Sequence, residues 1–174
     1  ASDALNLHAI RLIGRHLRPA VANGNLADLS GMAMASMLAG MGFNNPRTTL
    51  VHAMSHAVTG HARVPHGIAN AILLPIVLEF NLIGNPEKHA EVAEALGEDT
   101  DGCTLMEAAR LAVDAVRALA EDVGIPRGLG EVGVTAAMHE ALADDTLKAA
   151  LGVALNARRP TREQVLALFR RAME

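Results

Sequence analysis

The sequence predicts an all-α fold, and three observations point to it. Apolar residues recur at helical spacing along most of the 174 residues. Two capping boxes, Thr104-x-x-Glu107 and Thr161-x-x-Gln164, mark helix starts. Runs of Val, Ile and Thr with the two-residue period of a strand are not evident. At this length we expect a single helical domain, residues 1–174, that buries its own core.

Two helices are expected before the first strong stop signal. The apolar stripe of residues 5–17 predicts a helix that ends near Pro19. A second helix is expected over residues 28–43, before an Asn-Asn-Pro stop. This helix carries a stripe of methionines, which we expect to fill gaps in the core rather than to form a binding surface. The stripe consists of Met34, Met37 and Met41.

The middle of the chain combines a histidine-rich stretch with the most apolar run. The stretch VHAMSHAVTGHARVPHG, residues 51–67, predicts a helix over about 47–60 followed by a loop to Pro65. The next helix, residues 68–81, should be kinked at Pro75. Because a membrane span needs about 20 apolar residues and this run is shorter and interrupted, we expect a buried helix instead.

The remaining helices are predicted mainly by their ends. Residues 84–86, Gly-Asn-Pro, open a short helix that should end at Gly97. The acidic loop 97–103 lacks the spacing of a calcium loop and should be solvated. A long helix follows the first capping box and ends at residues 124–126, Gly-Ile-Pro. The last helix follows Pro160.

Composition and charge exclude several classes of function. The formal net charge of −4, scattered basic residues and only three aromatic side chains argue against a nucleic-acid-binding protein. The single cysteine, Cys103, excludes an internal disulfide and fits a reducing compartment. The first residues do not resemble a signal peptide. We therefore expect a cytoplasmic protein that binds neither nucleic acid nor membrane.

Four of the eight histidines lie between positions 52 and 66. On a helix, His52 and His56 project from one face, and His66 follows after the loop. Neutral imidazoles suit zinc, iron, copper or nickel, so this spacing leaves a metal site and a packed histidine cluster as alternatives. His61 is expected just past the helix end, in solvent. Ala53 occupies the glutamate position of an HExxH motif, which excludes that hydrolase chemistry.

Residues 39–81, AGMGFNNPRTTLVHAMSHAVTGHARVPHGIANAILLPIVLEFN, resemble the signature region of the iron-containing (group III) alcohol dehydrogenases. Residues 2–13, 124–135 and 156–173 are similar to further family segments, so the resemblance covers essentially the whole chain. It implies the helical C-terminal domain of the iron-type alcohol dehydrogenase / dehydroquinate synthase-like fold. The motifs A-G-M-x-F and P-H-G-x-x-N-A favour alcohol dehydrogenases over maleylacetate reductases, glycerol dehydrogenases and dehydroquinate synthase relatives.

The resemblance also implies a site and a reaction. In this family a metal, Fe2+ or sometimes Zn2+, is held by one aspartate and three histidines, two of which match His52 and His66. His56 matches a histidine near the nicotinamide and the substrate, which makes it the expected catalytic and cofactor-binding residue. This assignment replaces the chelating pair His52 and His56 that spacing alone suggests. The implied reaction is hydride transfer between NAD(P) and a small alcohol or aldehyde, with the metal as Lewis acid.

The chain also departs from the family pattern. The remaining two ligands come from a D-A-x-x-H helix that follows a nucleotide-binding domain, and we expect both parts to be absent here. Asp3 and His8 do not replace them, because five residues place side chains about 140° apart on a helix. His61 stands where an aromatic residue is common, and Ile76 where many members have a histidine. We therefore expect the isolated chain to bind metal weakly and to be inactive.

A non-enzymatic helical module that oligomerises or binds a partner, with remnant histidines, is the alternative function. The coding sequence upstream of this segment would distinguish the two. In the isolated chain, we also expect an exposed apolar face around residues 52–67, which would favour a homo-oligomer.

Overall fold

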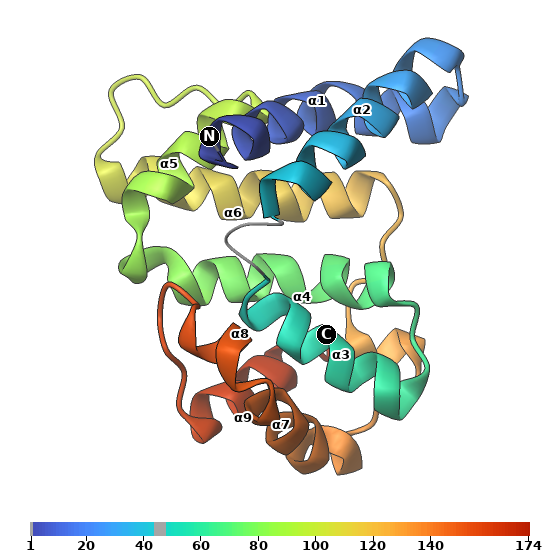
Figure 1. Ribbon diagram of the computed structural model, residues 1–174, viewed down its shortest axis with the longest axis vertical. Helices are drawn as coiled ribbons and strands as arrows, with labels where there is room; N and C mark the ends of the chain where they lie inside the picture. The colour runs from blue at the N-terminus through green and yellow to red at the C-terminus, as the bar shows by residue number, and fades with distance from the viewer. Residues whose placement is uncertain (1, 44–47) are drawn as a thin grey trace. The chain divides into compact units, whose positions relative to one another are not determined.

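The computed structural model describes residues 2–43 and 48–174 (Figure 1). These residues form α-helices and short 3-10 helices and contain no strand, which confirms the predicted all-α class. The elements are α1 (Ser2–Asn23), α2 (Leu26–Phe43), α3 (Leu50–Ala62), α4 (His66–Asn81), η1 (Leu82–Gly84), α5 (Pro86–Leu96), α6 (Leu105–Asp122), η2 (Leu129–Val132), η3 (Ala136–Met138), α7 (His139–Lys148), α8 (Ala150–Ala154) and α9 (Arg162–Arg171).

The described residues divide into two compact units. The first comprises residues 2–43 and 85–123, with α1, α2, α5 and α6, and the second comprises 48–84 and 124–174, with the other elements. That residues 1–174 behave as a single domain stays a prediction.

Within the first unit, α1 packs against α2 and α5. The helix α1 runs through Pro19 to Asn23, so the predicted end near Pro19 is wrong. Ala20 is buried just beyond the proline, and the chain leaves the helix at Gly24, whose φ of +61° suits a residue without a side chain. Packing and the glycine stop therefore determine this helix end.

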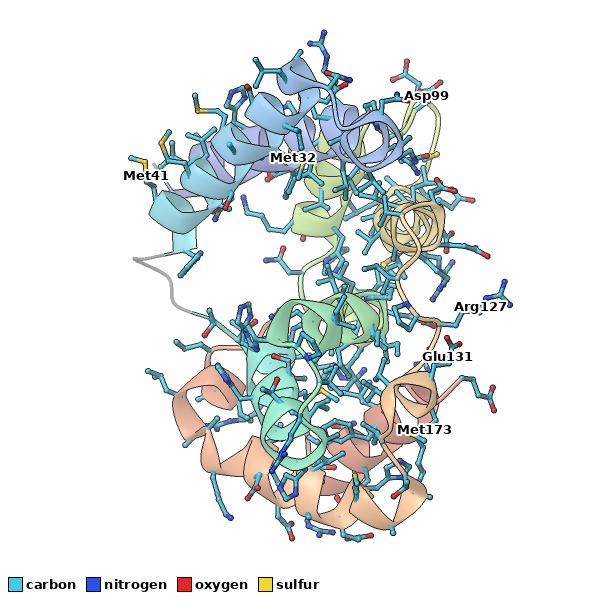
Figure 2. All side chains as sticks on the ribbon, turned by 90° about the vertical axis from the view of Figure 1, so that its right-hand side faces the viewer. Met32, Met41, Asp99, Arg127, Glu131 and Met173 are labelled. Atoms are coloured by element: carbon cyan, nitrogen blue, oxygen red, sulfur yellow. The ribbon has the colours of Figure 1, made fainter. Side chains whose placement is uncertain are left out.

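The methionine stripe of α2 is exposed, which contradicts its predicted place in the core. Met34, Met37 and Met41 are 47%, 52% and 58% exposed, and Figure 2 shows Met41 projecting from α2. The small residues of the helix take the buried side instead. A side chain at Gly42 would overlap the amide of Asn6 on α1, and one at Gly31 would overlap the ring of His16. Glycines at 31 and 42 therefore face the side chains of α1, and the methionines lie outside.

The second unit contains a core to which α3, α4, α7 and α9 contribute. The helix α4 begins at His66, two residues earlier than predicted, and continues through Pro75. By length and composition, α2 and residues 66–84 could each cross a membrane, although a soluble core helix passes the same test. The predicted burial of the apolar run on α4 is confirmed. Its core residues are Ala69, Ile72, Leu73, Val77 and Phe80.

The predicted helix ends that rest on local chemistry are confirmed. Both capping boxes form, at Thr104 and at Thr161. The side chain of Asn85 caps α5, and Gly97 ends it with a φ of 100°. Residues 98–103 are mostly exposed, as predicted for this loop.

Candidate metal centre

The helices α3 and α4 are joined by a three-residue reversal, Arg63-Val64-Pro65. Arg63 ends α3 in the left-handed conformation, with a φ of 55°, and its N–H donates to the carbonyl oxygen of Thr59 at 3.0 Å. Val64 is 3% exposed and anchors the reversal in the core. Pro65 then precedes His66, the first residue of α4, so the reversal returns His66 toward the histidines of α3.

The helix α3 divides its two faces between packing and histidines. Four residues of the first face are buried in the core: Ala53, Met54, Ala57 and Val58. On the other face His52 is partly buried and His56 is exposed. This arrangement confirms that His52 and His56 share one side of a helix. The expected apolar face around residues 52–67 is wrong, because the large apolar side chains there are buried. The exposed residues there are His56, Gly60, His61, Arg63, Pro65 and Gly67 instead.

The three imidazoles lie close together. Ring centroids are 5.4 Å apart for His52 and His66, 6.5 Å for His52 and His56, and 4.7 Å for His56 and His66. The rings of His56 and His66 are stacked, with 24° between their planes, whereas the ring planes of His52 and His66 differ by 58°. The fold therefore brings together all three histidines named from the sequence.

These distances bear on which pair fits one metal ion. Imidazoles bound to one ion at about 2.0–2.1 Å, at adjacent positions, have ring centroids roughly 4.5–5.5 Å apart. The separation of His52 and His66 falls in this range, and that of His52 and His56 exceeds it. Stacked rings such as those of His56 and His66 do not direct nitrogens to a common point. The centroid separation of His52 and His66 is therefore compatible with two ligands of one ion.

The histidines alone do not complete a metal site. Among residues 2–43 and 48–174, no three or more histidine, cysteine, aspartate or glutamate side chains are grouped to hold an ion. Asp3, whose spacing from His8 does not suit a shared ion, is exposed and pairs with Lys88 at 2.8 Å. His61 lies inside α3 and pairs with Asp145 at 2.6 Å, so its predicted position beyond the helix is wrong, although it is exposed as predicted.

Burial sets the charge state of His52. Desolvation lowers the pKa of its imidazole, and repulsion by His66 and then by His56 lowers that pKa further. A lower pKa keeps the ring neutral near pH 7, and the neutral ring has the lone pair that binds a metal.

Two polar residues for which no role was predicted contact His66. Ser55 Oγ lies 3.3 Å from His66 Nδ1 and donates to the backbone carbonyl oxygen of His52 at 3.1 Å. Asn70 Nδ2 lies 2.9 Å from His66 Nε2. Ser55 is three residues after His52, and Asn70 is four residues after His66. On a helix both spacings place a side chain near the histidine, so this spacing could have identified both residues.

Solved structures of an oxidoreductase and an alcohol dehydrogenase share this fold. A solved structure of 1,3-propanediol oxidoreductase superposes with a TM-score of 0.96 at 44% identity, over 99% of this chain and 45% of that chain. The alcohol dehydrogenase of Oenococcus oeni superposes with a TM-score of 0.94 at 42% identity, over 98% of this chain and 44% of that one.

Relatives identified by sequence similarity are oxidoreductases by name as well. The 1,3-propanediol dehydrogenase of Citrobacter freundii is 47% identical over 98% of this chain, and the lactaldehyde reductase of Escherichia coli (strain K12) is 39% identical over 98%. The chain spans 44% of the length of each of these relatives. The model of the Fe-containing alcohol dehydrogenase family, C-terminal, matches residues 1–173. The chain therefore belongs to the Fe-containing alcohol dehydrogenase family and corresponds to its C-terminal helical domain.

The left-handed conformation of Arg63 predicts a local stability effect. For a residue with a side chain this conformation costs about 1–2 kcal/mol, and asparagine tolerates it best after glycine. Arg63→Asn should raise the free energy of unfolding by roughly 0.5 kcal/mol, and Arg63→Val should lower it by about 1 kcal/mol. Urea denaturation measures both. Arg159→Asn, an exposed arginine with negative φ, controls for the lost charge; equal effects at both positions would contradict the explanation.

The lowered pKa of His52 predicts a pH-dependent stability. Because the folded pKa is below the unfolded value of about 6.5, the unfolded chain binds the proton first as the pH falls. The stability that neutral His52 contributes is therefore present above about pH 6.5 and is lost below it, until folded His52 is itself protonated. In the presence of a chelator, His52→Asn should lose less stability than wild type between about pH 7.5 and about 5.5.

Denaturation curves across this range, with an NMR titration of the ring protons, measure the effect. A His52 ring that titrates above free histidine would contradict it.

Proposed function

We propose that this chain is the metal-bearing catalytic half of an iron-dependent alcohol dehydrogenase that interconverts a small alcohol and its aldehyde with NAD(P). The observation that carries the proposal is the convergence of His52, His56 and His66 on one side of the α3–α4 pair. Family membership and the oxidoreductase names of the relatives support the reaction class.

Each histidine has a distinct role in this proposal. His52 and His66 hold the metal, Fe2+ or Zn2+, because their separation fits a shared ion and burial keeps His52 neutral. When bound, the ion supplies Lewis acidity toward the substrate oxygen, and the nicotinamide exchanges hydride with the carbon. His56 is exposed and stacked on His66, which leaves its nitrogens accessible to relay the hydroxyl proton and to contact the cofactor.

The names of the relatives suggest the substrate class. They act on 1,3-propanediol and lactaldehyde by name, and another relative is the sulfoacetaldehyde reductase of Bilophila wadsworthia, 41% identical. Short, polar alcohols and aldehydes are therefore the first substrates to test. A soluble cytoplasmic enzyme fits these relatives as well.

The isolated chain should be inactive in this proposal. Two imidazoles leave an ion with most of its positions open, and the described residues add no grouped third ligand. The chain also spans only 44% of the length of its dehydrogenase relatives.

A chimaera tests the proposal directly. Residues 1–174 replace the matching C-terminal part of the Citrobacter freundii relative, to which they are 47% identical. The purified chimaera should bind one Fe2+ or Zn2+ tightly and oxidise 1,3-propanediol with NAD+, whereas the isolated chain should bind metal only weakly and show no oxidation. His52→Ala and His66→Ala should abolish metal binding and activity. His56→Ala should keep the metal and lower kcat by roughly 10²-fold or more, the usual contribution of a proton-transfer group.

His61→Ala is the matched control, because His61 is an exposed histidine on the same helix that pairs with Asp145. It should leave metal content and kcat unchanged. A folded chimaera that lacks both metal and activity would instead support the alternative, a helical interaction module with remnant histidines. A chimaera that stays active without His52 and His66 would contradict their role as metal ligands.

We also infer a homo-oligomer, on a different surface from the one expected from the sequence. The exposed apolar side chains of α2 include Leu26, which is 80% exposed, and the three methionines. Met37→Glu should shift the molar mass measured by light scattering toward the monomer. A wild-type chain that is monomeric at high concentration would contradict the inference.

A further inference from the structure

The ring of His66 is held at both nitrogens by side chains of the same unit. On one side Ser55 is fully buried, with 0% exposure, and its hydroxyl is 3.3 Å from Nδ1. On the other side the Asn70 amide nitrogen is 2.9 Å from Nε2. The proposed function assigns no role to either Ser55 or Asn70.

The hydrogen bonds determine which ring nitrogen of His66 carries the proton. The hydroxyl of Ser55 has one hydrogen, which it donates to the carbonyl oxygen of His52, so toward His66 the same oxygen acts as an acceptor. His66 Nδ1 then carries the hydrogen and donates it. The amide nitrogen of Asn70 has only hydrogens to offer, which requires Nε2 to be the acceptor. Both contacts indicate the same tautomer.

The rotation of the Asn70 amide is consistent with this tautomer. As placed, its Oδ1 is buried without a partner. Exchanging the two atoms would leave Nδ2, with two donors, without a partner and would turn Oδ1 toward Nε2. It would also require the Ser55 hydroxyl to leave the His52 carbonyl for Nδ1, at the longer of its two distances. The arrangement with one unpaired acceptor leaves fewer groups unsatisfied.

We propose that Ser55 and Asn70 are positioning residues for His66. Ser55 fixes the tautomer in which Nε2 carries the lone pair, and the amide of Asn70 occupies that lone pair until a metal displaces it. Because Ser55 also bonds to the backbone of His52, it links the two candidate ligands of α3 and α4. The metal-displacement step rests on the proposed function, whereas the tautomer does not.

The displacement has a consequence for metal affinity. Asn70 must release His66 Nε2 before an ion binds there, so its hydrogen bond competes with the metal. The Asn70 Oδ1 atom has no hydrogen-bond partner here, so no bond to this oxygen resists rotation of the amide. Removing Asn70 should therefore tighten metal binding, while removing Ser55 should weaken it because Nδ1 no longer has a fixed acceptor.

The tautomer is measured first, on the whole 174-residue chain without metal, by long-range proton–nitrogen NMR of labelled histidine. Wild-type His66 should show a protonated Nδ1 and a bare Nε2. Ser55→Ala should introduce the Nε2-protonated form, and Asn70→Ala should leave Nδ1 protonated. Thr146→Val is the matched control, because Thr146 is a fully buried hydroxyl that donates to the carbonyl oxygen of Leu142 and does not contact a histidine.

Zinc titration followed by the same signals then measures affinity. Ser55→Ala should raise the Kd for Zn2+ about tenfold, the usual effect of losing a partner of a ligating histidine. Asn70→Ala should lower the Kd, and Thr146→Val should not change it. In wild type, zinc should shift the Asn70 amide signals together with those of His66.

Each outcome decides one step. A wild-type His66 with a protonated Nε2, or an unchanged tautomer in a folded Ser55→Ala variant, would overturn the role of Ser55. A higher Kd in Asn70→Ala, or no response of His66 to zinc, would overturn the displacement step. Because the tautomer is read without metal, it stands or fails independently of the chimaera's activity.

Discussion

The reversal between α3 and α4 is the constraint on which the candidate site depends. The helical period places His52 and His56 on one face, but it says nothing about His66. Three residues bring His66 back to them: Arg63 in a left-handed conformation, Val64 buried in the core, and Pro65 at the entrance to α4. A backbone conformation that costs free energy persists here because the buried valine holds it in place. The histidines are thus assembled by packing and backbone geometry.

The helix α3 contributes both to the core and to the candidate site, so the packing of one face determines the position of the histidines on the other. The face of α3 that contains Met54 and Val58 is fully buried and sets the rotation of the helix. That rotation leaves His52 at the edge of the core, where desolvation lowers its pKa. A ring further out would be protonated more easily, and a ring further in would not reach an ion. The position of His52 therefore follows from the apolar pattern beside it.

Local chemistry made part of this structure predictable. Capping boxes, the glycine at position 97 and the four-residue spacing of His52 and His56 involve neighbours in sequence, and each was confirmed. The predictions that failed depend on what a helix packs against. The methionines of α2 were placed in the core because they are apolar, but glycines at 31 and 42 allow the closer approach to α1. The role of Ser55 was missed because its contact with His66 exists only after the reversal, whereas Asn70 lies four residues from His66 on the same helix.

In the proposed function, folding and metal binding are separate. In small zinc domains the metal supplies the folding free energy, because the ligands are not assembled without it. Here the three imidazoles are placed by the core of the second unit, by the reversal and by contacts such as that of Ser55 with His66. Histidine side chains carry no negative charge, so a divalent ion held by two of them would keep its full charge uncompensated. In the proposed function a carboxylate would therefore be the decisive further ligand, since it would contribute charge to histidines that are already in position.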